Sequence, residues 1–161
     1  MENSSNKLIP ASTVLVIRDG LDDIEVFMVV RHHQIDFASG ALVFPGGKVD
    51  ESDLNPEIRR HIVTETEISD EELSYKIAGI RECYEEANVL FAYEQNEKEI
   101  ISSERLEKLA KWREEFNNKK GSMFDFAVKE NIIFNLDNLI PFAHWITPKM
   151  MPKRLDTYFY L

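Results

Sequence analysis

The feature that most constrains the fold is a charged cluster, Arg-Glu-Cys-Tyr-Glu-Glu at residues 81–86, set inside a long amphipathic pattern. Apolar side chains recur every three or four residues through this segment, at Leu73, Ile77, Ile80, Tyr84, Ala87 and Phe91. Such spacing predicts an amphipathic helix with one face against a core. Ser69 and Glu72 have the spacing of a capping box, so we expect the helix to begin there and to end near residue 87.

Three carboxylates of the cluster share one side of this helix. Glu82, Glu85 and Glu86 lie at i, i+3 and i+4, so they fall within an arc of about 100° on the face turned away from the core. Like charges at this spacing repel one another, and a hard divalent cation such as Mg²⁺, which prefers oxygen ligands, would convert the repulsion into coordination. Arg81, four residues before Glu85, can hold that carboxylate by a forked contact. The alternative interpretation is a solvated acidic helix face.

β-Branched residues predict the strands that accompany the helix. Residues 12–18 and 24–31 have the pattern of a hairpin. Residues 41–44 form a short strand that ends at the Pro-Gly-Gly turn of residues 45–47, where we expect strand pairing to stop. Gly79 is unfavourable inside a helix, and it would permit close approach of that glycine turn.

The remaining elements follow from shorter patterns. We expect a short helix from Asn55-Pro56 to residue 62, helices at 104–116 and 122–130, and strands at 142–147 and 154–161. Trp112 and Phe116 stand at helical spacing and are predicted to belong to the core.

The cluster and the glycine turn together resemble the conserved box of the Nudix hydrolase family. In that box a Gly, five residues and a Glu are followed by Arg-Glu-aliphatic-x-Glu-Glu-x-Gly. Five residues separate Gly47 from Asp53, which stands where the family has Glu, and residues 81–86 match the second half. Cys83 takes the aliphatic position. Asn88 replaces the closing glycine, which is a mild change because Asn tolerates the left-handed conformation of a helix C-cap.

A long insertion splits the box, since 27 residues separate Asp53 from Arg81 where the family usually has seven. This resembles the branch that contains peroxisomal coenzyme A diphosphatases and their bacterial relatives, which also carry motifs like those at 145–148 and 154–157. The resemblance implies an α+β Nudix fold, with a mixed β-sheet sandwiched between helices and an extra helical segment at about 95–135. It further implies one domain over residues 1–161, with a flexible N-terminus at 1–10 and the box insertion at 54–72.

The family resemblance implies a metal-dependent diphosphatase, in which water attacks one phosphorus and the other phosphate leaves. Mg²⁺ or Mn²⁺ would neutralise the phosphate oxygens and activate the water. Carried over by motif, Glu82, Glu85 and Glu86 are the metal ligands, with the Gly46 carbonyl a further candidate, and Arg81 orients Glu85. The catalytic set is then Glu85, Glu86 and Arg81, with the general base open between Glu85 and a residue that relatives carry further along the chain.

The substrate implied is a nucleoside diphosphate derivative, with coenzyme A and ADP-ribose types both open. Candidate substrate-binding residues are Arg31, Phe44, Gly47 and Arg154. Arg31 and Phe44 fall in register with a coenzyme A signature upstream of the box, whereas Asp36 takes a position where that signature has Arg and would repel a phosphate. Lys149, Lys153 and Arg154 form a small basic cluster that either holds a phosphate or solvates a loop.

Charge and cysteine content narrow the partners and the compartment. The 19 Lys and Arg against 29 Asp and Glu give a net charge of −10, which argues against nucleic acid and an anionic membrane surface as partners. The single cysteine, Cys83, and the absence of a secretory pattern suit a reducing, cytoplasmic location. Cys83 is not expected to be a nucleophile, since no His stands in a matching motif.

The family resemblance also implies that relatives continue beyond the last strand with a further strand and a helix that packs on the sheet. We therefore expect an open sheet face or edge here, and a homodimer that covers it. An alternative function follows from the same expectation: a catalytically weak or inactive Nudix fold that serves as a binding or assembly module.

Overall fold

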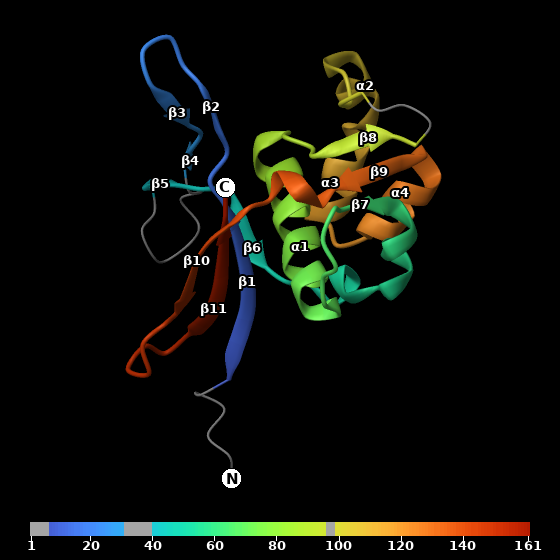
Figure 1. Ribbon diagram of the computed structural model, residues 1–161. Helices are drawn as coiled ribbons and strands as arrows, with labels where there is room; N and C mark the ends of the chain where they lie inside the picture. Colours follow the sequence, from blue (N-terminus) through green and yellow to red (C-terminus); the bar gives the residue numbers. More distant parts are fainter. Residues whose placement is uncertain (1–6, 31–39, 96–98) are drawn as a thin grey trace.

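A four-stranded mixed sheet forms the centre of the computed structural model, which describes residues 7–30, 40–95 and 99–161 (Figure 1). The strand order is β10-β11-β1-β6. These strands are β10 (Pro141–Ile146), β11 (Arg154–Tyr160), β1 (Leu8–Val14) and β6 (Gly46–Lys48). β1 and β11 are parallel, and the other two pairs are antiparallel.

Helix α1 (Asp70–Ala87) packs on one face of this sheet against β1 and β6. The Ser69 side chain accepts a hydrogen bond from the Glu72 amide, and Asn88 ends the helix in the left-handed conformation with φ of 56°. The predicted caps at Ser69 and Asn88 are confirmed, but the N-terminal one is half of a capping box: among the contacts of the described residues, no bond returns from the Ser69 amide to the Glu72 side chain. The apolar positions Leu73, Ile77, Ile80 and Tyr84 are buried, which fixes the orientation of the acidic face.

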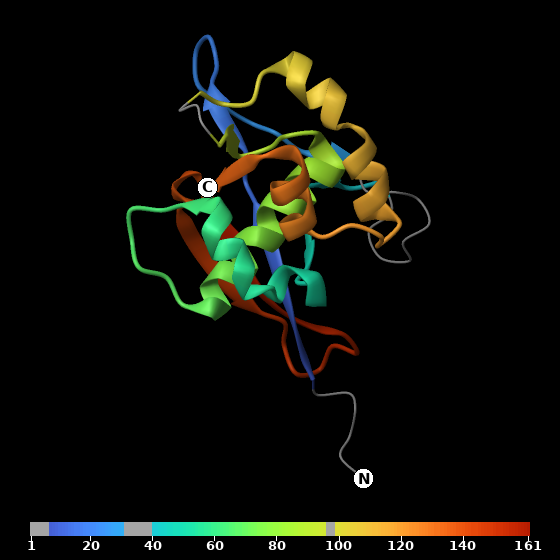
Figure 2. The ribbon, with the colours of Figure 1, turned by 90° about the vertical axis from the view of Figure 1, so that its right-hand side faces the viewer.

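A second layer lies beyond α1. It holds a three-stranded sheet of order β7-β9-β8, made of β7 (Ile62–Val63), β9 (Ile132–Asn135) and β8 (Ala92–Glu94). Around it lie α2 (Ser103–Leu109), α3 (Lys111–Asn117), α4 (Met123–Glu130) and the 3₁₀ turns η2 (Glu51–Leu54), η3 (Pro56–His61) and η4 (Leu136–Asn138). Figure 2 views the molecule from this helical side. No helix in the described part of the chain is both long and apolar enough to cross a membrane.

Aromatic side chains fill the space between α1 and this second layer. Tyr84 of α1 stacks on Phe126 of α4, with ring centroids 5.4 Å apart. Trp112 and Phe116 of α3 also contact Phe126 and are buried, as predicted. The Tyr84 hydroxyl donates to the Leu109 carbonyl at 2.8 Å, so the helical segment after residue 95 is tied directly to α1.

The predicted hairpin of residues 12–18 and 24–31 is confirmed only in part, as β2 (Ile17–Asp19) paired with β3 (Ile24–Val26). Residues 12–14 belong instead to β1 of the central sheet, and residues 29–30 form a separate strand. It projects away from the central sheet in Figure 1. A further pair, β4 (Val29–Val30) with β5 (Leu42–Val43), brackets residues 31–39, which lie outside the described residues.

Two expectations about the glycines need correction. Gly46 and Gly47 do not stop strand pairing, because they lie within β6 and pair with Thr13 and Ser12 of β1. Gly79 is approached by side chains and not by the backbone of these glycines: a Cβ there would lie 2.8 Å from Ser12 Oγ and 3.1 Å from Val14 Cγ2. Gly46 and Gly47 are tolerated within β6 because α1 packs closely on that strand.

The single helix expected at 104–116 is two helices that meet at Ala110. The Ala110 amide bonds to the Glu107 carbonyl, three residues back, and this tighter turn separates α2 from α3. Leu109 and Trp112 are both buried across the break.

The α+β Nudix architecture predicted from the sequence is confirmed, with one difference in its layers. The helices of the described residues all lie on the α1 side of the four-stranded sheet (Figures 1 and 2). The opposite face of that sheet forms the floor of a groove.

Candidate active site

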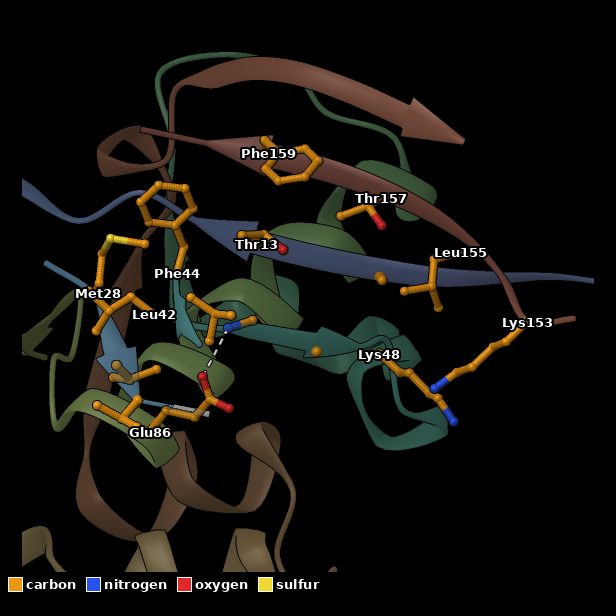
Figure 3. Close-up of a pocket in the computed structure, with 16 residues that line it drawn as sticks. Thr13, Met28, Leu42, Phe44, Lys48, Glu86, Lys153, Leu155, Thr157 and Phe159 are labelled. Carbon is orange, nitrogen blue, oxygen red and sulfur yellow. Dashed lines mark hydrogen bonds between the residues drawn. The ribbon is translucent and has the colours of Figure 1, made fainter. Parts of the chain in front are cut away.

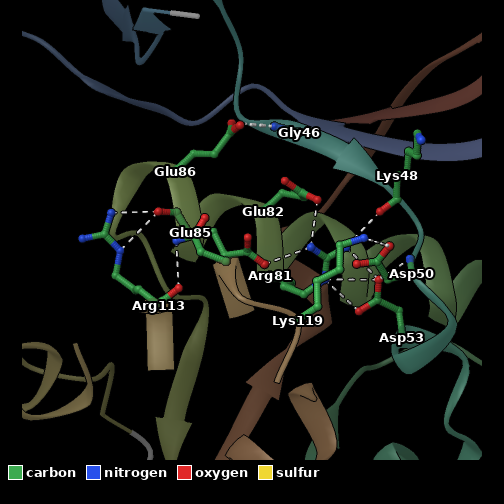
Figure 4. A network of polar contacts seen from close by, with 11 residues as sticks. Gly46, Lys48, Asp50, Asp53, Arg81, Glu82, Glu85, Glu86, Arg113 and Lys119 are labelled. Carbon is green, nitrogen blue, oxygen red and sulfur yellow. Dashed lines mark hydrogen bonds and ion pairs between the residues drawn. The ribbon is translucent and has the colours of Figure 1, made fainter. Parts of the chain in front are cut away.

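The close packing of β6 on α1 brings the glycine pair against the acidic helix face. The Gly46 amide donates to Glu86 Oε2 at 3.1 Å. A Cβ added to Gly47 would lie 2.3 Å from Glu82 Oε1, so a side chain at this position would displace that carboxylate. Figure 4 shows Glu82 and Glu86 directed from α1 towards this strand, and Glu85 directed towards Arg81. Gly46 and Gly47 therefore make space for the carboxylates of α1 and do not form a turn.

Arg81 is the centre of the polar network below the glutamates (Figure 4). Its Nη1 donates to Glu82 Oε1 at 2.8 Å and to Glu85 Oε1 at 2.9 Å. Its Nη2 donates to the Lys48 carbonyl at 2.9 Å, which ties α1 to β6. The side chain is only 6% exposed, so its charge is satisfied by these partners and by one more carboxylate.

That carboxylate belongs to Asp53, which the sequence placed in the box but to which it gave no role. Arg81 Nε and Nη2 donate to the Asp53 carboxylate at 2.9–3.2 Å, and the Asp53 side chain is fully buried. Asp53 also accepts from the Asp50 amide at 2.9 Å. The spacing from Gly47 in the box was the one sequence signal for this residue.

Arg113 is a further contact that the sequence did not indicate. Its Nη2 and Nε donate to the Glu85 carbonyl at 2.8 and 3.2 Å (Figure 4). This carbonyl lies in the last turn of α1, where helical carbonyls lack intrahelical donors and a cation interacts favourably with the helix dipole. Arg113 of α3 thus caps the turn that bears Glu85 and Glu86.

The cluster concentrates negative charge at a partly enclosed position. Burial raises the pKa of Glu82 to about 7, and the neighbouring charges of Glu85 and Glu86 add to the effect against the opposing influence of Arg81. Burial likewise raises the pKa of Glu85, and the Arg81 contact opposes it. The protein alone therefore does not fully compensate these carboxylates.

The raised pKa of Glu82 predicts that the free energy of unfolding of the metal-free protein falls with rising pH. Glu82 has an ordinary pKa of 4.5 and a folded pKa of about 7. The unfolded chain therefore releases this proton first, and the contribution to the free energy of unfolding is lost between about pH 4.5 and pH 7. We expect Glu82→Gln to become increasingly more stable than the unmodified protein across this window in EDTA, measured by urea unfolding. A difference that stays constant from pH 4 to pH 8 would contradict the assignment.

The donor set fits a hard divalent cation, since it consists of carboxylates beside a strand whose glycines leave space for them. The side chains are not arranged as a finished site: among the described residues no group of three His, Cys, Asp or Glu converges to hold a metal ion. The reason is visible in the contacts, because Glu82 and Glu85 each turn one oxygen to Arg81, and Glu86 turns one to Gly46. Side-chain rotation would be needed for all three to share one ion.

Two cavities flank the cluster. The larger, of about 620 Å³, runs over the open face of the four-stranded sheet (Figure 3). Its walls are mostly apolar, with Phe44, Leu155 and Phe159 among them, and Glu86 lies at its edge. The smaller, of about 210 Å³, lies over Arg81, Glu82 and Glu85 and is closed on one side by the end of α3. Lys48 lines both, so a ligand could reach from the groove to the carboxylates.

The predicted substrate-binding residues are distributed unequally. Phe44 and Gly47 line the groove. Arg31 lies outside the described residues. Arg154 is largely buried and donates to the Thr147 carbonyl at 3.0 Å, and it is not among the residues that line the groove. Lys153, its neighbour, does line the groove.

A Gly-Gly strand packed on an Arg-Glu-x-x-Glu-Glu helix, within this mixed sheet, defines a domain of the Nudix class. A comparison with family models agrees: residues 59–161 match the model described as the NUDT19 Nudix domain. The chain belongs to that family.

Two individual proteins are similar to the chain. One is an acyl-coenzyme A diphosphatase, NUDT19, of Xenopus laevis, with 24% identity over 183 residues that cover 89% of this chain and 48% of the relative. The chain thus spans about half the length of this curated relative. The other is the crystal structure of a Nudix hydrolase from Alicyclobacillus acidocaldarius, with a TM-score of 0.72 and 25% identity over 98% of this chain and 70% of that one.

Proposed function

We propose that the protein is a divalent-metal-dependent hydrolase that cleaves the diphosphate linkage of a nucleoside-diphosphate-linked compound. The observation that carries this proposal is the carboxylate cluster of α1 held against Gly46 and Gly47 beside the buried Arg81. Membership of the Nudix family, and the similarity to a hydrolase and a diphosphatase, support it.

Glu82, Glu85 and Glu86 would hold Mg²⁺ or Mn²⁺ in this proposal. When bound, the metal supplies charge neutralisation on the phosphate oxygens and lowers the pKa of coordinated water. The Gly46 amide contacts Glu86, and Arg81 contacts Glu82 and Glu85, so the three carboxylates are held close together, and side-chain rotation would let them share one ion.

Hydrolysis requires a proton acceptor for the attacking water. The water oxygen bonds to one phosphorus, the bond from that phosphorus to the bridging oxygen breaks, and the other phosphate leaves with the bridging electrons. Glu85 is the candidate base of this chain, because burial raises its pKa and so favours proton uptake. Its second oxygen, Oε2, has no Arg81 contact within the described residues.

We propose a coenzyme A type of compound as the first substrate to test, ahead of the ADP-ribose type. The similar Xenopus laevis protein is named as an acyl-coenzyme A diphosphatase. The groove beside Glu86 is large and mostly apolar, which suits the long uncharged part of such a molecule.

The proposal predicts metal-dependent turnover and metal-dependent stabilisation. A panel of coenzyme A, acyl-coenzyme A, ADP-ribose, NADH, dinucleoside polyphosphates and nucleoside triphosphates is incubated with Mg²⁺ or Mn²⁺, and products are separated by chromatography. We expect cleavage of a coenzyme A compound, abolished by EDTA, and a rise in melting temperature with millimolar metal. Folded protein that neither cleaves any compound nor responds to either metal would overturn the proposal.

One observation favours the alternative of a binding module without turnover. Each of the three glutamates has an oxygen engaged by the protein itself, two by Arg81 and one by Gly46. Binding of a panel compound without its cleavage in either metal would select that alternative.

The homodimer and the cytoplasmic location both stay predictions. Phe142 and Trp145, exposed on the edge strand β10, are surface that a second copy could cover.

A further inference from the structure

Two lysine side chains meet at one end of the groove. Lys48 is the last residue of β6, and Lys153 directly precedes β11. Both line the large cavity. Figure 3 shows their ammonium groups pointing towards one another, at the end of the groove away from Phe44 and Met28.

The strand register explains why these two residues share a face. Side chains two apart along a strand point to the same side, so Lys153 precedes Leu155, Thr157 and Phe159 on the groove face. Lys48 lies opposite Ala11 of β1, which is itself opposite Thr157 of β11. The two lysines thus reach the same end of the groove from two sides of β1.

The position of this lysine pair relative to the glutamates follows from the same register. Gly46, which contacts Glu86, lies opposite Thr13, and Lys48 lies opposite Ala11. Two residues of extended strand span about 7 Å, and the lysine stem adds to that length. An anion bound by the pair would therefore be a different group from a diphosphate bound at the carboxylates.

Electrostatics indicate that this end of the groove attracts an anion. Within the described residues, neither ammonium group has an ion pair, whereas Lys119 lies 3.8 Å from Asp50 and Lys111 is 2.9 Å from Glu130. The chain as a whole has a net charge of −10. Two like charges directed at each other in an acidic protein repel, and a bound anion converts that repulsion into attraction.

We infer that Lys48 and Lys153 bind a second phosphate, carried by the same nucleotide as the diphosphate to be cleaved. This inference rests on the proposed function and deepens it, because it makes the lysine pair a determinant of substrate specificity. Nucleotides with a phosphate on the ribose 3′ position, as in coenzyme A, are preferred to those without it. The apolar walls between the pair and Glu86 contact the uncharged parts of the ligand.

Binding in EDTA tests the inference without turnover. Adenosine 3′,5′-bisphosphate and adenosine 5′-monophosphate are titrated by calorimetry into the unmodified protein, Lys153→Gln and Lys149→Gln. The sequence left Lys149 open between phosphate binding and solvation of a loop, and the structure places it exposed in the β10–β11 loop, outside the residues that line the groove, so it is a matched control. We expect the bisphosphate to bind about fivefold more tightly than the monophosphate, as one solvent-accessible ion pair allows. Lys153→Gln should lose this preference and Lys149→Gln should keep it. Equal affinities in the unmodified protein, or a preference that survives in Lys153→Gln, would overturn the inference.

Turnover separates this inference from the proposed function. The ratio of kcat/KM for coenzyme A to that for 3′-dephospho-coenzyme A should fall about fivefold in Lys153→Gln, through KM, and stay unchanged in Lys149→Gln. Cleavage of both compounds with no change of the ratio would leave the diphosphatase proposal standing and reject the lysine pair. A bisphosphate preference in EDTA without cleavage of either compound would do the reverse.

Discussion

Replacing Arg81 with Met should lower the free energy of unfolding by about 3–5 kcal/mol, measured by urea denaturation. Arg81 is 6% exposed and pairs with an Asp53 side chain that is 0% exposed. Its removal leaves a buried carboxylate without its cation and the Lys48 carbonyl without a donor. Breaking one side of a buried pair costs far more than the net value of the pair, because the remaining charge stays out of water.

Arg59 provides the matched control for this substitution. It too forks onto an aspartate, with Nε and Nη2 both donating to Asp70 Oδ1 at 3.0 and 2.7 Å. That pair is solvent-exposed, at 39% for Arg59 and 83% for Asp70, so Arg59→Met should cost about 1 kcal/mol or less. The double substitution Arg81→Met with Asp53→Leu should recover part of the loss. Equal costs for Arg81→Met and Arg59→Met would show that burial does not set the value of the Arg81 network.

Replacing Glu86 with Gln should reduce diphosphate hydrolysis by about 100-fold or more, while the protein stays folded. Gln retains an oxygen that can accept from the Gly46 amide, so the local structure is preserved. It lacks the negative charge that a divalent cation requires, so the apparent Kd for Mn²⁺ should also rise, as read by electron paramagnetic resonance. The two measurements distinguish a lost metal ligand from a lost base.

Glu71→Gln is the control, because Glu71 lies in the first turn of the same helix, far along it from the glutamate cluster. It should leave both hydrolysis and Mn²⁺ binding unchanged. Hydrolysis by Glu86→Gln at the rate of the unmodified protein would remove Glu86 from the proposed site. A lost rate with unchanged Mn²⁺ affinity would instead assign Glu86 to proton transfer or substrate contact.

The packing at Gly79 illustrates what a pattern can indicate and what it cannot. A glycine inside a helix indicates that another segment packs closely there, and the close packing predicted at Gly79 is confirmed. The neighbour is β1, through Ser12 and Val14, rather than the glycine turn. Which segment packs on Gly79 depends on the order of the strands in the sheet, and the residues around Gly79 do not determine that order.

The sequence by itself determined helix α1, its caps and the grouping of Glu82, Glu85 and Glu86 on one face. These features depend on residues within a few positions of one another, where helical periodicity and capping preferences act directly. The Nudix class also followed from the sequence, because its box is a local motif apart from the insertion. The buried Trp112 and Phe116 were predicted on the same basis of spacing.

Only the tertiary structure decided how that face is used. The Arg81–Asp53 pair and the Arg113 contact to Glu85 each join residues 28 apart, and the Gly46–Glu86 bond joins residues 40 apart. Local propensity carries no information on such contacts. They arise when β6 and α3 pack on α1, because a buried guanidinium or carboxylate is tolerated only where the assembled fold supplies its partner. The lysine pair has the same origin, since a shared sheet face, and not proximity in sequence, brings Lys48 and Lys153 together.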